Sequence, residues 1–364
     1  MKKTDRYIDD TLFSCVVGSN IYKKESEELV VYGQSRVIVS LVDGPEDEKY
    51  YLKPVSTSVL NPQTSAHLAR IRRSILNPPP RGACYWPVDC IAFDTETTID
   101  IQQKNRTGRD TVEDKSVYAM VFPYDGRPVR ALRDLLSPAD ETDYYCRNVK
   151  WSTMKPYIIA FLKQMITLQN EGCSSPMLSD DDIFFVEAGP VTTAIVDCNA
   201  FLMRREDDHF SPPDVLLDYE YLDYHYFESH TLDRFSESHS LAAMLFKMCI
   251  GILPYASANI GNYYQNQDQL LTWLQNYQTE ANQRFVFGRD YPNGNGVGND
   301  YLVDNTVLPK WRGLSEELKQ MFEMVLCREN VLRTRGRDVV TAYTAEDWLA
   351  AFNRFYNSQG GKTV

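Results

Sequence analysis

The sequence predicts an α+β protein of two lobes, a β-rich lobe followed by a mostly helical lobe. Short runs of β-branched and aromatic residues dominate the first third of the chain, as in 27–44 and 49–56. After about residue 128, apolar residues recur at helical spacing instead, beginning with the amphipathic run 153–172. We therefore place the small lobe at residues 1–127 and the large lobe at residues 128–364.

The small lobe is expected to be a set of strands around one helix. Runs 27–44 and 49–56 flank the acidic turn "DGPEDE" and are read as strands. A helix is predicted at 64–76, where apolar residues follow helical spacing, and the proline triplet that follows ends it. Two more strands are expected at 89–97 and 116–124, on either side of a polar stretch.

The large lobe is expected to begin with the helix 153–172, which Gly172 ends. The stretch 182–201 then reads as two strands of a hairpin with a turn at 188–190. The remainder is helical in pattern. The expected helices are 234–251, 266–280, 314–327 and 344–356.

Composition and charge bound the function. A formal net charge of -12 argues against a nucleic-acid or anionic-membrane partner, because phosphate surfaces select basic patches. None of the eight cysteines forms a CxxC pair, which indicates free thiols in a reducing cytosol. The N-terminus shows no apolar signal segment, and the apolar run 240–256 contains Lys247, so it is read as a buried helix. We expect a cytoplasmic protein without a membrane segment.

Several stretches, in this order along the chain, resemble parts of the protein kinase fold. The chain is similar in particular to divergent bacterial kinase-like proteins associated with von Willebrand A-type and PP2C-type phosphatase proteins. The resemblance implies a bilobal kinase-like fold. The stretches are "ILNPPPRGACYWPVD" (75–89), "FSPPDVL" (210–216), "SESHSLAAMLFKMCIGILPY" (236–255), "PKWRGLSEELKQMFEMVL" (309–326) and "YTAEDWLAAF" (343–352).

The resemblance assigns Lys53 as the strand lysine that holds the α- and β-phosphates of a nucleotide. Lys49 competes for this assignment but lies beside the acidic turn, so we expect it to be exposed. A glutamate on the following helix should orient the lysine. Leu68 occupies that position, and the helix carries no acidic residue. The lysine–glutamate ion pair of the family is therefore absent or supplied from elsewhere.

The other nucleotide and metal contacts are only partly preserved. Gly33 is the single glycine of the stretch that should cover the phosphates, where backbone N–H groups must approach closely. The resemblance also implies nucleotide contacts at Met120 and Phe122. Asp197, which follows the hairpin, and Asp182 match the two metal-binding positions and could hold Mg²⁺ or Mn²⁺.

The catalytic loop departs most from the family. Met177 occupies the position of the aspartate that accepts the substrate hydroxyl proton, and a thioether cannot act as a base. A shift of the alignment by three or four residues would restore a base, for which Asp180 and Asp182 are the candidates. The acidic residue that anchors the buried helix of the family is matched by Glu237 or a neighbour.

We therefore expect a pseudokinase-like regulatory or binding protein, with ATP and a divalent metal bound weakly or not at all. The resemblance implies a protein partner, such as a PP2C-type phosphatase or a von Willebrand A-type protein. An active but divergent Ser/Thr protein kinase is the first alternative.

The second alternative is a DnaQ-like 3'–5' exonuclease. In "IAFDTETT", Asp94 and Glu96 alternate along a strand, which places both carboxylates on one face and suits a two-metal site. That family also requires a later Tyr-x-x-x-Asp, which occurs at 219–223 and 343–347. The acidic balance of the chain counts against this reading.

Plainer structural roles compete with these assignments. Lys53 could point to solvent, and Asp197 could cap the turn after its strand. The histidines of 207–230 match no zinc pattern. The tyrosines of the same stretch, Tyr221 and Tyr226 among them, are expected to pack into the large lobe or to form a partner surface.

Overall fold

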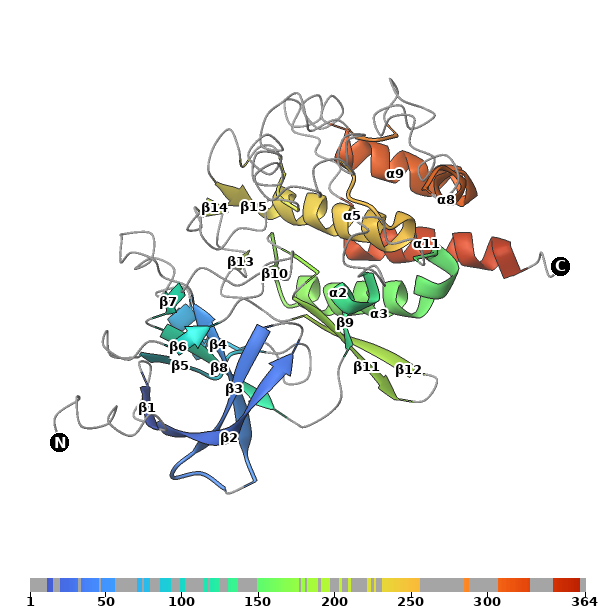
Figure 1. Cartoon of the computed structure of the whole chain (residues 1–364). Coiled ribbons are helices and arrows are strands. Elements are labelled where there is room, and N and C mark those ends of the chain that lie inside the picture. The colour runs from blue at the N-terminus through green and yellow to red at the C-terminus, as the bar shows by residue number, and fades with distance from the viewer. Residues whose placement is uncertain are drawn as a thin grey trace, which may run out of the picture. The chain divides into compact units, whose positions relative to one another are not determined.

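The computed structural model of the chain divides into two compact units, each of which we describe by itself (Figure 1). Unit 1 contains Met1–Val129, Ile195–Leu202 and Pro212–Leu217, and unit 2 contains Arg130–Ala194, Met203–Ser211 and Asp218–Val364. The residues that the structure describes are 12–15, 20–31, 34–45, 47–55, 71–73, 75–78, 86–92, 99–101, 114–116, 118–124, 130–136, 149–176, 178–180, 182–188, 191–196, 203–204, 209–210, 221–223, 226, 231–255, 285–287, 307–327 and 343–360.

Unit 1 is built on a curled antiparallel sheet that closes on itself, with the strand order β1-β2-β3-β4-β8-β5. Strand β1 completes the closure because it pairs with both β2 and β5. A separate antiparallel pair consists of β6 and β7. The bounds are β1 Leu12–Cys15, β2 Ile21–Val31, β3 Gln34–Leu41, β4 Lys49–Val55, β5 Asp89–Ala92, β6 Ile99–Ile101, β7 Asp114–Ser116 and β8 Tyr118–Tyr124.

The sequence of strand β8, YAMVFPY, is apolar without alternation, and the burial of the strand explains why. Successive side chains of a strand point to opposite faces. Ala119 and Val121 lie in one buried cluster with Val39, Leu52 and Ile91. A second buried cluster contains the intervening Met120 and Phe122, with Tyr51, Cys90 and Ile71. Both faces of the strand are therefore covered, which selects apolar residues at every position.

Unit 2 contains the helices of the second part of the chain and several short strands. Strands β9, β11 and β12 form a three-stranded sheet in the order β12-β11-β9, and the pairs β10–β13 and β14–β15 are antiparallel. The helices are α2 Leu132–Leu136, α3 Trp151–Asn170, α5 Arg234–Ile250, α8 Leu308–Gly313, α9 Glu316–Leu326 and α11 Ala345–Gly360. The strands are β9 Arg130–Ala131, β10 Cys173–Ser174, β11 Ile183–Ala188, β12 Val191–Val196, β13 Met203–Arg204, β14 His209–Phe210 and β15 Leu232–Asp233, and the last two residues of β12 are counted with unit 1.

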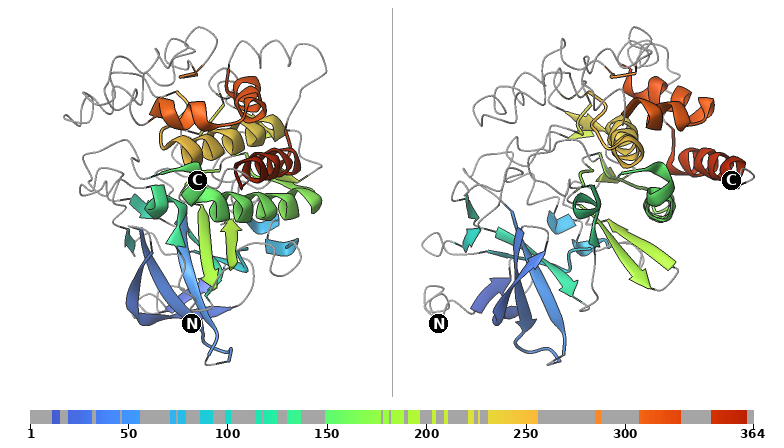
Figure 2. Two further views of the ribbon diagram at one scale, coloured as in Figure 1. Left: turned by 90° about the vertical axis from the view of Figure 1, so that its right-hand side faces the viewer. Right: turned by 45° about the vertical axis from the view of Figure 1, so that its right-hand side comes forward.

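Helix α5 is the centre of unit 2 and lies between α3 and α9 (Figures 1 and 2). Residues 241–246 of the helix are fully buried. Phe246 contacts the rings of Phe285, Trp311 and Phe322, which belong to distant parts of the sequence. The helix ends at Gly251, whose backbone is left-handed with a φ of 89°. The expectation that the apolar run 240–256 forms a buried helix is confirmed for residues 240–250.

The start of α5 is fixed by a reciprocal cap, from which a first prediction follows. The Asp233 carboxylate accepts hydrogen bonds from the N–H groups of Phe235 and Ser236, and the Ser236 hydroxyl accepts one from the Asp233 N–H.

Asp233→Ala is expected to lower the free energy of unfolding by about 1–2 kcal/mol, measured by urea denaturation. Asp233→Asn keeps the acceptor and is the control. An equal loss in both variants would contradict the assignment.

The mixture of helices and strands that the sequence predicts is confirmed, and most expected elements that fall on described residues are present. The expected helix 153–172 is α3, and 344–356 corresponds to α11, which extends to Gly360. The run 27–44 divides into parts of β2 and β3, and 314–327 contains α9, which Ser315 caps. Of the helix 64–76, residues 71–73 and 75–76 are helical, and 64–70 lie outside the described residues. The helix 266–280 also lies outside the described residues.

Candidate functional site

The loop that connects α3 to β11 carries the acidic residues of the candidate site. Gly172 leaves α3 with a φ of 69°, a conformation that favours glycine, and β10 follows at once. The loop then closes in a turn, in which the Asp182 N–H donates to the Ser179 carbonyl oxygen at 3.2 Å. This turn places Asp180 at its tip and Asp182 directly before the first residue of β11.

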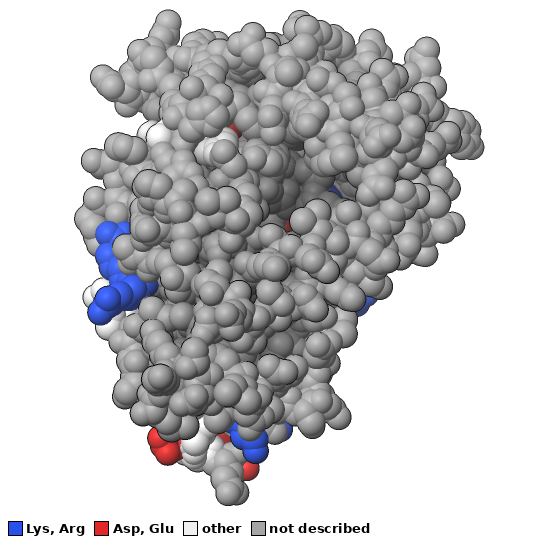
Figure 3. Space-filling view, turned by 60° about the vertical axis from the view of Figure 1, so that its left-hand side comes forward, with Lys and Arg blue, Asp and Glu red and all other residues white. Residues whose placement is uncertain are grey.

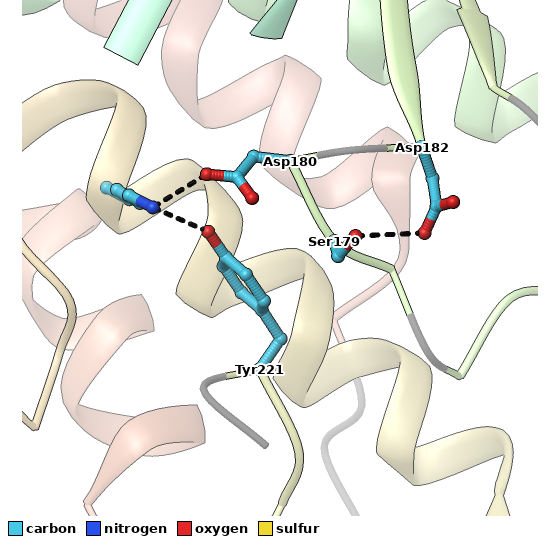
Figure 4. A network of polar contacts seen from close by, with 5 residues as sticks. Ser179, Asp180, Asp182 and Tyr221 are labelled. Carbon is cyan, nitrogen blue, oxygen red and sulfur yellow. Dashed lines mark hydrogen bonds and ion pairs between the residues drawn. The ribbon is translucent and has the colours of Figure 1, made fainter. Parts of the chain in front are cut away.

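Asp180 is bound to a lysine of α5. The Lys247 ammonium group lies 2.7 Å from the Asp180 carboxylate, and it also donates a hydrogen bond to the Tyr221 hydroxyl at 2.9 Å (Figure 4). The side chains of Lys247 and Asp180 are only 15% and 4% exposed. Two opposite charges are therefore paired in a nearly dry environment. Removing either partner there leaves an unpaired buried charge and lowers the stability of the fold.

Asp182 is buried and bonded within its own turn. Its carboxylate accepts a hydrogen bond from the Ser179 hydroxyl at 3.1 Å. Figure 4 shows this carboxylate separated from Asp180, which points toward α5 instead. The two acidic side chains of the loop that the structure describes therefore have different partners, a cation for Asp180 and a hydroxyl for Asp182.

Glu237, in the first turn of α5, holds the start of the same loop. Its carboxylate accepts hydrogen bonds from the Ser175 N–H at 2.6 Å and from the Gln169 side chain at 3.0 Å. Burial raises the pKa of Glu237 from 4.5 to about 7, although both hydrogen bonds act in the opposite direction. The Gln169 side-chain oxygen in turn accepts from the N–H of Ala345, the first residue of α11. Glu237 thus connects the loop, α3 and the start of α11.

Other polar residues of α5 attach the loop and the segment 221–223 to this helix. The Ser240 hydroxyl lies 3.0 Å from both the Pro176 and the Tyr221 carbonyl oxygens. The Ser236 hydroxyl donates to the Asp223 carboxylate at 3.0 Å. Helix α5 therefore fixes the backbone of both segments whose side chains meet at Lys247.

In unit 1, the structure places three of the predicted nucleotide contacts in register on neighbouring strands. Lys53 on β4 is paired with Met120 on β8, and Tyr51 is paired with Phe122. Met120 and Phe122 are buried in the apolar cluster already described, where the Tyr51 and Phe122 rings stack with centroids 5.2 Å apart. Their contribution to a nucleotide site, and that of Lys53, stays a prediction.

Several predicted site residues lie outside the described residues, so the structure does not test them. They are Gly33, Leu68, Asp94, Glu96, Met177 and Asp197. Tyr221 and Tyr226 are buried, which supports packing as the role of these two tyrosines.

Metal-binding groups, membrane-spanning helices and surface charge can be described only for part of the chain. Among the described residues, no three His, Cys, Asp or Glu side chains come together as a metal-binding group. None of the helices that the structure describes is both long and apolar enough to cross a membrane. On the face in Figure 3, described basic side chains form one group at the left edge, and basic and acidic ones lie together at the lower end. Nucleotide and metal binding remain expectations from sequence, and so does the absence of a nucleic-acid partner.

The sequence reasoning missed Lys247 and Tyr221 as members of the site. In the sequence, Lys247 is only a charge that interrupts an apolar helix. That charge is itself a signal, because a lysine inside a buried helix requires an acidic partner. The identity of the partner could not be read, since Asp180 lies 67 positions away in sequence. Asp180 and its two acidic neighbours were equivalent candidates.

Comparisons with known proteins do not assign the chain to a family. No family model matches the sequence, and no curated protein matches it.

Proposed function

We propose that the chain is a kinase-like regulatory or binding module in which phosphoryl transfer has been lost. The proposal includes the bilobal kinase-like fold that the sequence resembles. Its main support is the ion pair between Asp180 and Lys247, because Asp180 is one of the two carboxylates that could replace the missing base. A base must reach the substrate hydroxyl. Asp180 is buried and bound to an ammonium group, so it does not meet that requirement.

The second carboxylate is no better placed for proton abstraction. Asp182 is 6% exposed and accepts from the Ser179 hydroxyl. It is better suited to the metal-binding role that the resemblance assigns to it, because that role needs only an oxygen ligand. The residue at the base position itself, Met177, has no proton-accepting group.

The anchoring of the loop supports the kinase-like part of the proposal. The resemblance assigns the acidic residue that anchors the buried helix of the large lobe to Glu237 or a neighbour. Glu237 accepts the N–H of Ser175, two positions before Met177. A buried helix that binds the backbone of this loop fits a scaffold that keeps its architecture without its base.

The proposed partners follow from the resemblance. We propose a protein partner, either a PP2C-type phosphatase or a von Willebrand A-type protein, and weak binding of ATP with Mg²⁺ or Mn²⁺ through Lys53, Asp182 and Asp197. An active divergent kinase and an exonuclease that uses Asp94 and Glu96 remain the alternatives to be tested.

The proposal predicts nucleotide binding without transfer. The melting temperature of the wild-type chain is expected to rise by a few degrees when ATP and Mg²⁺ or Mn²⁺ are added, because a ligand that binds only the folded state stabilises it. The rise is expected to disappear in Lys53→Ala and Asp197→Asn. Lys49→Ala changes a lysine on the same strand and is the matched control, which should keep the rise.

The transfer assay separates the alternatives. No labelled phosphate should pass from ATP to the protein or to a general kinase substrate. Transfer that Asp180→Asn or Asp182→Asn abolishes would instead establish an active kinase. Metal-dependent digestion of single-stranded DNA that Asp94→Ala abolishes would establish the exonuclease. Absence of any thermal response to ATP would remove the nucleotide from the proposal and leave the protein partner.

A further inference from the structure

Gln169, the last residue but one of α3, connects helix α5 to helix α11. Its side-chain nitrogen Nε2 donates to the Glu237 carboxylate at 3.0 Å, and its side-chain oxygen Oε1 accepts from the Ala345 N–H at 3.0 Å. The other oxygen of Glu237 accepts the Ser175 N–H at 2.6 Å. The start of α11 is therefore attached to α5 through a single amide group.

The orientation of the Gln169 amide follows from its two neighbours. The Ala345 N–H can only donate, so it requires the amide oxygen and leaves the NH₂ group for Glu237. An ionised carboxylate can only accept, and it satisfies this NH₂ group and the Ser175 N–H together. Among the residues that the structure describes, both partners of the Glu237 carboxylate are donors. The network is therefore complete when Glu237 is ionised.

A protonated Glu237 changes this arrangement, because its hydroxyl group needs an acceptor. The carbonyl oxygen of the acid still accepts the Ser175 N–H, and the hydroxyl group then faces Gln169. It finds an acceptor there only when the Gln169 amide turns over, which places the NH₂ group against the Ala345 N–H. Two donors then face each other, and the hydrogen bond of the Ala345 N–H is lost.

Burial decides which group gives up its hydrogen bond. The Glu237 side chain is only 6% exposed, so an acid proton without an acceptor would be isolated from water. Ala345 lies at the first position of α11, and its neighbours Thr344 and Glu346 are exposed. Its N–H reaches water once the first turn of the helix loosens. Turning the amide over is therefore the less costly response to the proton.

We propose that Gln169 is a proton-controlled switch, which holds the first turn of α11 while Glu237 is ionised and releases it when Glu237 is protonated. The Ser175 N–H has an oxygen acceptor in both forms, so the switch acts on α11 and leaves the loop anchored. Burial raises the pKa of Glu237 to about 7, which brings the change close to neutral pH. The inference does not depend on nucleotide binding or on the proposed loss of phosphoryl transfer.

Other charged or titratable groups lie on α5 and on the segments packed against it. Among the described residues, none of them forms a hydrogen bond or an ion pair with Glu237. Asp347 of α11 accepts from the Thr344 N–H at 2.8 Å and so forms a separate cap beside Ala345. The remaining groups are Asp233, His239 and Lys247 of α5 and its cap, Lys163 and Glu171 of α3 and its end, Asp180, Asp182 and Asp223 of the loop segments, Glu346 of α11, Glu316, Glu317, Lys319 and Glu323 of α9, and Lys310 and Arg312 of α8.

The test compares the solvent exchange of two backbone amides in the full chain, measured by NMR and divided by the intrinsic rates, as the pH is raised through 7. The ¹³C shift of the Glu237 carboxyl carbon reports its charge, and Glu237→Gln identifies that signal by its loss. The Ala345 amide is expected to exchange about fivefold to tenfold faster once Glu237 is protonated, the effect of one lost hydrogen bond. The Ser175 amide should keep its protection. An Ala345 protection that stays constant through the Glu237 midpoint would overturn the proposal.

Three variants assign the change to the switch. Gln169→Met has no amide, so the Ala345 amide should exchange fast at every pH and show no step. Glu237→Gln cannot titrate and should show no step either. Asp347→Asn is the matched control, because it removes a charge from the first turn of α11, keeps an oxygen acceptor for the Thr344 N–H and should retain the step. A step that persists in Gln169→Met, or that disappears in Asp347→Asn, would assign the effect to another group and refute the switch.

Discussion

The free energy of unfolding of the wild-type chain, minus that of Glu237→Gln, is expected to fall by about 3 kcal/mol as the pH rises from below 4.5 to above 7. Burial raises the pKa of Glu237 from 4.5 to about 7, so the folded state takes up a proton that the unfolded state releases. The resulting stabilisation is fully present below pH 4.5 and is lost as the pH rises through about 7. Each pKa unit corresponds to about 1.4 kcal/mol.

Urea denaturation of both proteins across this range measures the difference, in which the titration of all other groups cancels to a first approximation. Gln169→Met provides an independent check. The Gln169 hydrogen bond favours the charged form of Glu237, so its loss should raise the pKa further and move the fall to higher pH. A difference that does not vary with pH would show that Glu237 keeps its ordinary pKa and is therefore hydrated.

The strands and helices could be predicted from sequence wherever local pattern decides them. Helix α5 combines a capping aspartate, an apolar run that Lys247 interrupts and a terminal glycine, and each of these signals is local. Strand β8 was equally readable, because both of its faces are buried and its residues are apolar throughout.

The closure of the sheet in unit 1 could not be predicted in this way. It depends on β1, a four-residue strand that pairs with β5 and places Cys15 opposite Ile91. So short a run has no distinctive period, and its partner lies far away in sequence. Tertiary pairing rather than propensity therefore determines this element.

The candidate site likewise has features that the local sequence predicts and features that only tertiary contacts determine. Its acidic residues were found from their positions around the catalytic loop, but their roles were not. Only the folded chain distinguishes Asp180, which is bound to Lys247, from Asp182, which is bonded to Ser179.

Lys247→Met is expected to lower the free energy of unfolding by about 3–5 kcal/mol, because it removes the cation that neutralises the buried Asp180 carboxylate. Methionine keeps the length and the apolar stem of lysine, so the loss reports the charge rather than a cavity. The matched control is Lys319→Met. Its ammonium group also lies 2.7 Å from a carboxylate, but that carboxylate belongs to Glu316 and is 80% exposed. Loss of this surface pair should cost less than about 1 kcal/mol.

A double-mutant cycle separates the interaction from the cost of burying each charge. Asp180→Asn combined with Lys247→Met removes both charges at once and should recover most of the stability that Lys247→Met loses, as measured by urea denaturation. If Lys247→Met cost no more than Lys319→Met, the pair would be hydrated, and Asp180 would become accessible to a substrate hydroxyl again. The same result would move the active kinase ahead of the pseudokinase. The stability of one ion pair therefore tests both the packing of helix α5 and the absence of a catalytic base.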